Sequence, residues 1–241
     1  RNFLIPPEQY AGSSEGYRRL NRFLNPASPP SKLELFKLKV IWNILRYGLP
    51  KLKESVACGQ YDFPAGLFFG GQQAGWSTQV VQKHCDEWLG AAPRIVHIDI
   101  HTGLGAFGSY KLLVTETQPN DNLAWYQDIY GADTVEPMAK PGGTAYQASG
   151  VFGTWMHNRF SDREYRTVGA EFGTYDVVRI LAALRAENRA DHYAAPDSPA
   201  YQQAKRELLE CFCPASDLWR KQLVESGLKI IDQSQRGLCA T

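Results

Sequence analysis

The sequence has no excess of charge of either sign and no long apolar run. Its 26 lysine and arginine residues face 25 aspartate and glutamate residues, which gives a net charge of +1, and the basic residues are spread along the chain. This balance gives no reason to expect a surface for nucleic acid or for an anionic membrane. No apolar run approaches the length that crosses a bilayer. We therefore expect no nucleic acid and no membrane as partners, and the oligomeric state stays open.

Cysteine is scarce, and its spacing follows no disulfide or metal-binding pattern. The five cysteines include no Cys-x-x-Cys pair, and an odd number does not suit a disulfide framework. Cys211 and Cys213 are too close together for an ordinary structural zinc knuckle, so we expect a reduced pair packed in the core. This pattern favours a cytoplasmic location. The sequence contains no internal repeat or low-complexity tract, and its length suits one large α/β core.

The most informative segment is 101–105, a histidine followed by a glycine-rich turn, at the end of a β-branched run over 94–100. The run predicts a buried strand, in which His97, Asp99 and His101 share one face. Ligands of open α/β sheets bind at the carboxyl ends of strands, where a histidine can be a metal ligand or a catalytic base. The competing interpretation is a buried histidine whose ring is hydrogen-bonded to a carboxylate.

A second strand is predicted over 165–175, with Glu171 near its end and a helix beginning near Asp176. The apolar neighbours Ala170 and Phe172 should desolvate the glutamate and raise its pKa toward the range in which it exchanges protons at neutral pH. A histidine and such a glutamate at two strand ends suggest metal-assisted hydrolysis. The alternative is that Glu171 caps the helix that follows.

Four segments of the chain occur in a characteristic order: Arg1–Phe3, Gly66–Gly71 followed by Trp76 and Ser77, Asp99–Gly105, and Glu171–Thr174. Together they resemble a little-characterised bacterial branch of the zinc carboxypeptidase superfamily, which is related to carboxypeptidase A and more distantly to aspartoacylase-type deacylases. The resemblance extends from Arg1 to about Tyr175. It implies an α/β fold over residues 1–241, a single catalytic domain that forms the C-terminal part of a carboxypeptidase-like mixed sheet flanked by helices.

The resemblance also implies a reaction, the hydrolysis of a peptide or N-acyl amide bond next to a free carboxylate, with zinc as the cofactor. It makes His101 a zinc ligand, and it makes Glu171 the base that takes a proton from the zinc-bound water and returns it to the leaving amine. Arg1 would bind the substrate carboxylate with its planar guanidinium. Tyr146 lies in the interval where the family has a mobile tyrosine that closes over the substrate.

The early zinc ligands of that family do not occur in this sequence. The family's His-x-x-Glu segment, an arginine that stabilises the oxyanion and an asparagine all precede the position of Arg1, so we expect the chain to be the later part of a longer domain. The string from His84 to Glu87 lies on the polar face of a predicted helix over 78–89, and we interpret it as solvated surface. A catalytic zinc site needs three protein ligands. The alternative function is therefore a catalytically inactive binding module of the same fold.

Apolar spacing predicts the remaining elements. A serine at 31 followed by a glutamate at 34 has the pattern of a capping box and predicts a helix start. The segment 151–158 can be a helix or a strand. The predicted helices cover 16–23, 31–58, 122–130, 177–188, 201–211 and 218–226, a further strand covers 110–115, and loops cover 60–77 and 136–144.

Overall fold

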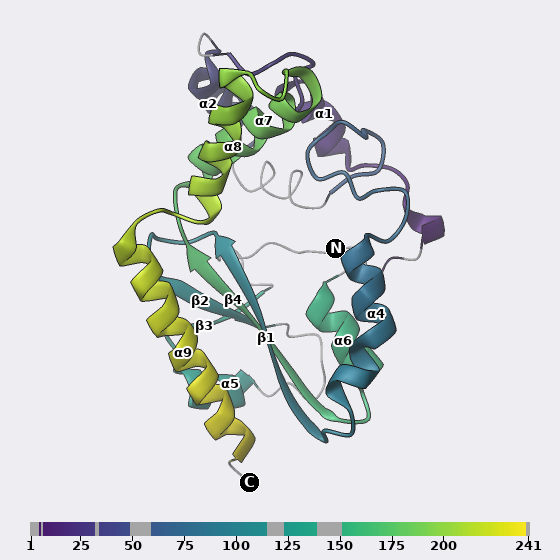
Figure 1. Cartoon of the computed structure of the whole chain (residues 1–241), viewed down its shortest axis with the longest axis vertical. Coiled ribbons are helices and arrows are strands. Elements are labelled where there is room, and N and C mark those ends of the chain that lie inside the picture. The colour runs from purple at the N-terminus through teal and green to yellow at the C-terminus, as the bar shows by residue number, and fades with distance from the viewer. Residues whose placement is uncertain are drawn as a thin grey trace.

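The computed structural model of the chain describes residues 5, 7–31, 34–48, 59–114, 123–138 and 151–239. Within these residues it is a mixed α/β structure with a four-stranded sheet flanked by helices (Figure 1). The strands are β1 Arg94–Gly103, β2 Tyr110–Val114, β3 Val135–Pro137 and β4 Glu164–Gly173. Their order across the sheet is β1-β4-β2-β3, with β1 parallel to β4, β2 antiparallel to β4, and β3 parallel to β2. The predicted α/β class and mixed sheet are confirmed.

The helices form three groups around the sheet. Helices α5 and α9 cover one face, α4 and α6 lie on the other, and α1, α2, α7 and α8 lie beyond the carboxyl ends of β1 and β4 (Figure 1). None of the helices that the structure describes has the length and apolar character needed to cross a membrane. The helices are η1 Pro7–Gln9, α1 Glu15–Leu24, α2 Phe36–Tyr47, α4 Trp76–Leu89, α5 Leu123–Tyr130, α6 Phe152–Arg159, α7 Val177–Tyr193, α8 Pro199–Phe212 and α9 Asp217–Cys239.

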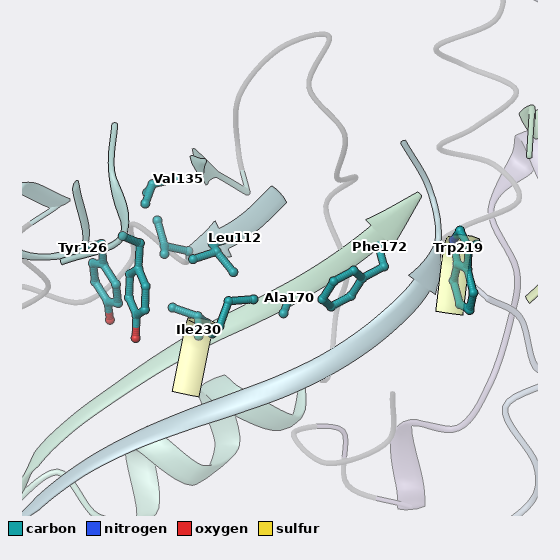
Figure 2. Close-up of a cluster of buried hydrophobic side chains, with 10 residues drawn as sticks. Leu112, Tyr126, Val135, Ala170, Phe172, Trp219 and Ile230 are labelled. Atoms are coloured by element: carbon teal, nitrogen blue, oxygen red, sulfur yellow. The ribbon is translucent and has the colours of Figure 1, made fainter. Parts of the chain in front are cut away.

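The face of the sheet toward α5 and α9 forms the largest described core cluster. Strand residues on this face pack against Tyr126 of α5 and against Trp219 and Ile230 of α9 (Figure 2). A fully buried side chain of this size contributes roughly 1.5–3 kcal/mol relative to an exposed one. The cluster therefore holds helices α5 and α9 against this face of the sheet. The strand residues labelled there are Leu112, Val135, Ala170 and Phe172.

The opposite face of the sheet is apolar near the start of its long strands and polar further along. Cys85 of α4 and Met156 of α6 pack with Ile95 of β1 and Tyr165 of β4 in a second buried cluster. Because alternate residues of a strand share a face, the same side of β1 continues through the polar residues predicted from the sequence. Helices α4 and α6 therefore pack against the beginning of this face, and the candidate site lies toward its end.

The predicted start of α2 at a capping box is wrong. The helix begins at Phe36, and its N-cap residue Leu35 makes no side-chain cap hydrogen bond. The Glu34 carboxylate does not turn back to cap the helix, because it pairs with Arg185 and Arg189 of α7. A buried glutamate between two guanidinium groups gains charge-assisted hydrogen bonds that a helix cap cannot match. The rest of the predicted helix, residues 49–58, lies outside the described residues.

Three smaller expectations also need correction. Residue 136 was predicted to open a loop but belongs to β3. Helix α9 continues to Cys239 instead of ending at 226. Cys211 is buried and Cys213 is exposed, so only one of the pair packs in the core, and both are free.

Candidate functional site

The structure brings His101 and Glu171 together on neighbouring strands. They are register partners in the parallel pair of β1 and β4. Register partners on adjacent strands point to the same face of a sheet, and parallel strands end at the same edge. Residues that are far apart in the sequence therefore meet at the carboxyl edge of the sheet, where ligands of α/β proteins bind.

Glu171 is a buried carboxylate with few polar contacts. Only 8% of the residue is exposed, and its Oε1 accepts a hydrogen bond of 2.9 Å from the backbone N–H of Leu104. Burial raises the pKa of Glu171 above its usual range, and the hydrogen bond from Leu104 and the charge of His101 only partly oppose that rise. The direction agrees with the prediction from the sequence, but the neighbours Ala170 and Phe172 lie on the opposite face of the strand, with α5 and α9. A carboxyl group with a raised pKa accepts a proton more readily than an ordinary carboxylate, as a general base must.

Asp99 holds the ring of His101. The His101 Nε2 lies 2.9 Å from the Asp99 Oδ2, and this hydrogen bond raises the pKa of His101 although burial opposes it. Burial would raise the pKa of Asp99, but the hydrogen bond and charge of His101 outweigh it and lower that pKa. A carboxylate bound to one ring nitrogen orients a histidine so that the other nitrogen, here Nδ1, can bind a ligand.

The glycine-rich turn after β1 lets the backbone pass close over the end of β4. Gly103 and Gly105 have φ angles of 143° and 113°, which favour glycine. A Cβ atom on Gly173 would lie 2.1 Å from the carbonyl oxygen of Ala106, so no side chain fits at Gly173. This close approach places the N–H of Leu104 against Glu171.

The carboxylate partner of the competing interpretation occurs at His101, which pairs with Asp99 but is exposed, whereas His97 is the more buried histidine and contacts aromatic residues. The His97 ring packs edge-on against Phe152 at 4.7 Å, and its Nδ1 lies 3.3 Å from the hydroxyl oxygen of Tyr165. Burial lowers the pKa of His97, opposed by the charge of Asp99. His97 is thus a histidine packed among aromatic rings, whereas His101, four residues on, is exposed.

Helix capping does not account for Glu171. The residue that caps α7 is Asp176, whose Oδ1 accepts hydrogen bonds from the backbone N–H groups of Val178 and Arg179 at 3.1 and 3.0 Å.

The register partner of Glu171 on β2 is Lys111. Its Nζ donates instead to the carbonyl oxygen of Asp133 at 2.5 Å. The hydrogen bond that Glu171 accepts therefore comes from the turn after β1, at Leu104, and not from Lys111.

The described residues supply only part of a zinc site. His101 is a possible ligand, but no group of three His, Cys, Asp or Glu residues that could hold a metal occurs in the described part of the chain. His84 is half-exposed and Glu87 exposed on α4, with 3.4 Å between Nδ1 and Oε2, which agrees with a surface position. The described residues therefore do not complete a catalytic zinc centre. Arg1 and Tyr146 lie outside the described residues, so their roles stay predictions.

The sequence matches one known protein family over most of its length. A family model described as "Protein of unknown function (DUF2817)" matches residues 1–226. The chain belongs to the DUF2817 family. No curated protein and no solved structure matches this DUF2817 chain. The description of the family names no activity.

Two features of the DUF2817 site were not assigned from the sequence. The sequence predicts Asp99 on the same face as His101 and allows a carboxylate partner for the histidine, but it does not predict that this partner orients an exposed ring; a carboxylate two residues before a histidine on a strand is a usable signal for that role. The second feature is the hydrogen bond from the backbone N–H of Leu104 to Glu171. Because every residue except proline has a backbone N–H, the residue type at position 104 does not predict this bond.

Proposed function

We propose that this DUF2817 protein is a zinc-dependent hydrolase of the carboxypeptidase type that cleaves a peptide or N-acyl amide bond next to a free carboxylate. One observation carries the proposal: the buried Glu171, with a raised pKa, is the register partner of the Asp99-bound His101 at the carboxyl edge of the sheet. This is the juxtaposition of a proton carrier and a possible metal ligand that the resemblance implied. The free cysteines suit a cytoplasmic setting.

In the proposed reaction, Glu171 takes a proton from the attacking water and returns it to the leaving amine. Its burial keeps the carboxylate poorly solvated, which makes it a better base than a surface glutamate. The N–H of Leu104 holds one carboxylate oxygen, Oε1, so the other oxygen is the one that carries the proton. Asp99 fixes the orientation of the His101 ring. The substrate carboxylate is assigned to Arg1 on the resemblance alone.

A second candidate function, a binding module without catalysis, is favoured by one observation. The described residues contain no three-ligand metal group. In that case the same face would recognise an N-acyl amino acid or a peptide without hydrolysing it.

The decisive experiment measures zinc content and hydrolysis together. The protein is prepared with any residues that are encoded before Arg1, because the described residues alone supply fewer than three zinc ligands. It is dialysed against zinc, its metal content is determined, and its turnover of peptides and N-acyl amino acids with a free carboxylate is followed. We expect Glu171→Gln to keep the metal content of the wild type and to lose about 10²- to 10⁴-fold in turnover, because an amide cannot accept the proton. We expect His101→Ala to lose metal.

His84→Ala is the matched control, since it removes a half-exposed histidine from a His-x-x-Glu string outside the site. It should behave as the wild type. If the wild type hydrolyses none of these substrates with zinc present but binds them at equilibrium, the binding module is the correct function. If His101→Ala and Glu171→Gln both keep full activity, the reaction takes place elsewhere in the protein.

A further inference from the structure

Helix α2 exposes a continuous stripe of large apolar side chains at the end of the molecule beyond the sheet (Figure 1). Four residues at spacings of three and four share one face of the helix. Each of them is more than half exposed, whereas single exposed apolar residues are ordinary and carry no meaning. The four are Leu38, Ile41, Trp42 and Leu45.

The inner face of α2 is firmly attached to the protein. Val40 is buried, and the ring of Phe36 stacks on Phe23 with centroids 5.9 Å apart. The guanidinium carbon of Arg185 lies 4.8 Å from the Phe23 ring centroid and 4.7 Å from that of Phe36. On a helix of 3.6 residues per turn, positions 36 and 40 are opposite positions 38, 41, 42 and 45. The stripe therefore points directly away from the protein.

The sequence that contains this stripe carries basic residues and no acidic ones. The sequence has no aspartate or glutamate between Glu34 and Glu54 but has five basic residues there, in a chain whose net charge is only +1. Helical spacing puts Lys39 and Arg46 beside the stripe. The carboxylate that precedes the helix in the sequence, Glu34, pairs with Arg185 and Arg189 and also contacts Lys39. The five are Lys37, Lys39, Arg46, Lys51 and Lys53.

Helix α9 provides an internal comparison. It also exposes large apolar side chains, namely Leu218, Val224, Leu228 and Ile231. Its charged residues, however, include acids as well as bases, with Asp217, Glu225 and Asp232 along the same helix. Apolar exposure is therefore common to the two helices. They differ in charge, because α2 has basic residues and no acidic ones.

We propose that α2 docks on an anionic lipid membrane surface. An apolar stripe with a tryptophan, flanked by lysine and arginine, is the composition of a helix that lies in the plane of the membrane interface. The stripe would enter the boundary between headgroups and acyl chains, and the basic side chains would contact the lipid phosphates. The net charge of the whole chain gives no sign of a membrane partner, because acidic residues elsewhere in the sequence offset the basic residues of this segment. The proposal is independent of the proposed hydrolysis.

Co-sedimentation with lipid vesicles tests the proposal. The chain is mixed with vesicles of phosphatidylcholine alone or with vesicles that contain about a quarter phosphatidylglycerol. We expect at least about tenfold stronger partitioning onto the anionic vesicles, reduced by added salt, because each basic residue near such a surface contributes about 1 kcal/mol, or about fivefold. We expect Leu45→Glu to lower this partitioning about tenfold or more. Leu228→Glu on α9 is the matched control and should stay within about twofold of the wild type.

Arg46→Glu is a second variant that leaves the stripe intact. It should weaken binding to anionic vesicles about tenfold or more, since it replaces attraction by repulsion. Equal partitioning onto both kinds of vesicle, or none onto either, would overturn the proposal, as would equal loss in Leu45→Glu and Leu228→Glu. A concentration-dependent dimer that Leu45→Glu abolishes would assign the stripe to a second copy of the chain and would overturn it too.

Discussion

Replacing Glu34 by glutamine should remove a large part of the stability of the helical region around α2. The Glu34 carboxylate lies 3.0 Å from the Arg185 guanidinium and also pairs with Arg189, and all three side chains are largely buried. Burial alone would raise the pKa of Glu34, but the hydrogen bonds and charges of the two arginines outweigh it and lower that pKa from 4.5 to about 2. A shift of this size corresponds to about 3 kcal/mol of stability at neutral pH.

The pH dependence of this contribution has a definite sign. Because the pKa of Glu34 is lower in the folded than in the unfolded chain, the contribution is complete above about pH 4.5 and is lost as the pH falls toward about 2. Glu34→Gln should therefore lower the free energy of unfolding by about 3 kcal/mol at pH 7, within the range for breaking a buried ion pair. The difference from the wild type should shrink below pH 4.5. Urea unfolding at a series of pH values measures both.

The control is Glu207→Gln, which removes a half-exposed ion pair with Arg179 at 2.9 Å. Exposed pairs contribute about 0–1 kcal/mol, so this variant should unfold almost as the wild type does. The reasoning about Glu34 is refuted if both variants lose the same amount. It is also refuted if the loss in Glu34→Gln does not change between pH 7 and pH 3.

Further predictions concern the site. Glu171→Gln should raise the free energy of unfolding at neutral pH, because a carboxyl group whose pKa is raised by folding destabilises the folded state once the pH exceeds its pKa in the unfolded chain. Thermal unfolding at pH 5 and pH 8 should show a larger gain in stability at pH 8. Asp99→Ala should lower zinc affinity about 10- to 100-fold in a chelator competition, whereas unchanged affinity would mean that Asp99 does not orient His101. Gly173→Ala should cost about 1–3 kcal/mol in urea unfolding, because the turn must move away from the new Cβ, and a neutral substitution would contradict the close approach. Arg1→Lys should reduce turnover of a carboxylate substrate and leave that of its amide almost unchanged, whereas equal losses in steady-state kinetics would remove Arg1 from the carboxylate-anchor role.

The elements with strong local patterns were predictable from the sequence. The β-branched run at β1, the strand before Glu171 and the helix begun by Asp176 all lie close to their predicted positions. Their signals are local, since alternation, spacing and a cap residue depend on a few neighbouring side chains. The shared face of His97, Asp99 and His101 followed from strand geometry in the same way.

The parts that were missed depend on contacts between distant segments. The start of α2 was misplaced because Glu34 binds arginines of α7, and the sequence near Glu34 does not show those partners. The N–H of Leu104 reaches Glu171 only because the turn passes over Gly173. The different environments of His97 and His101 also depend on packing, since α6 covers one and not the other. Local patterns cannot distinguish such cases.

The pairing of β1 with β4 has a consequence for how the protein acquires its site. The hydrogen bond between Leu104 and Glu171 joins residues 67 positions apart, and forming such a parallel pair requires closure of a long loop, which is slow. The carbonyl of Gly173 is then bound by the indole N–H of Trp219 on α9. During synthesis on a ribosome, the glutamate would emerge well before Trp219. The acid–base group should therefore reach its final geometry only after α9 has been synthesised and has packed against the sheet.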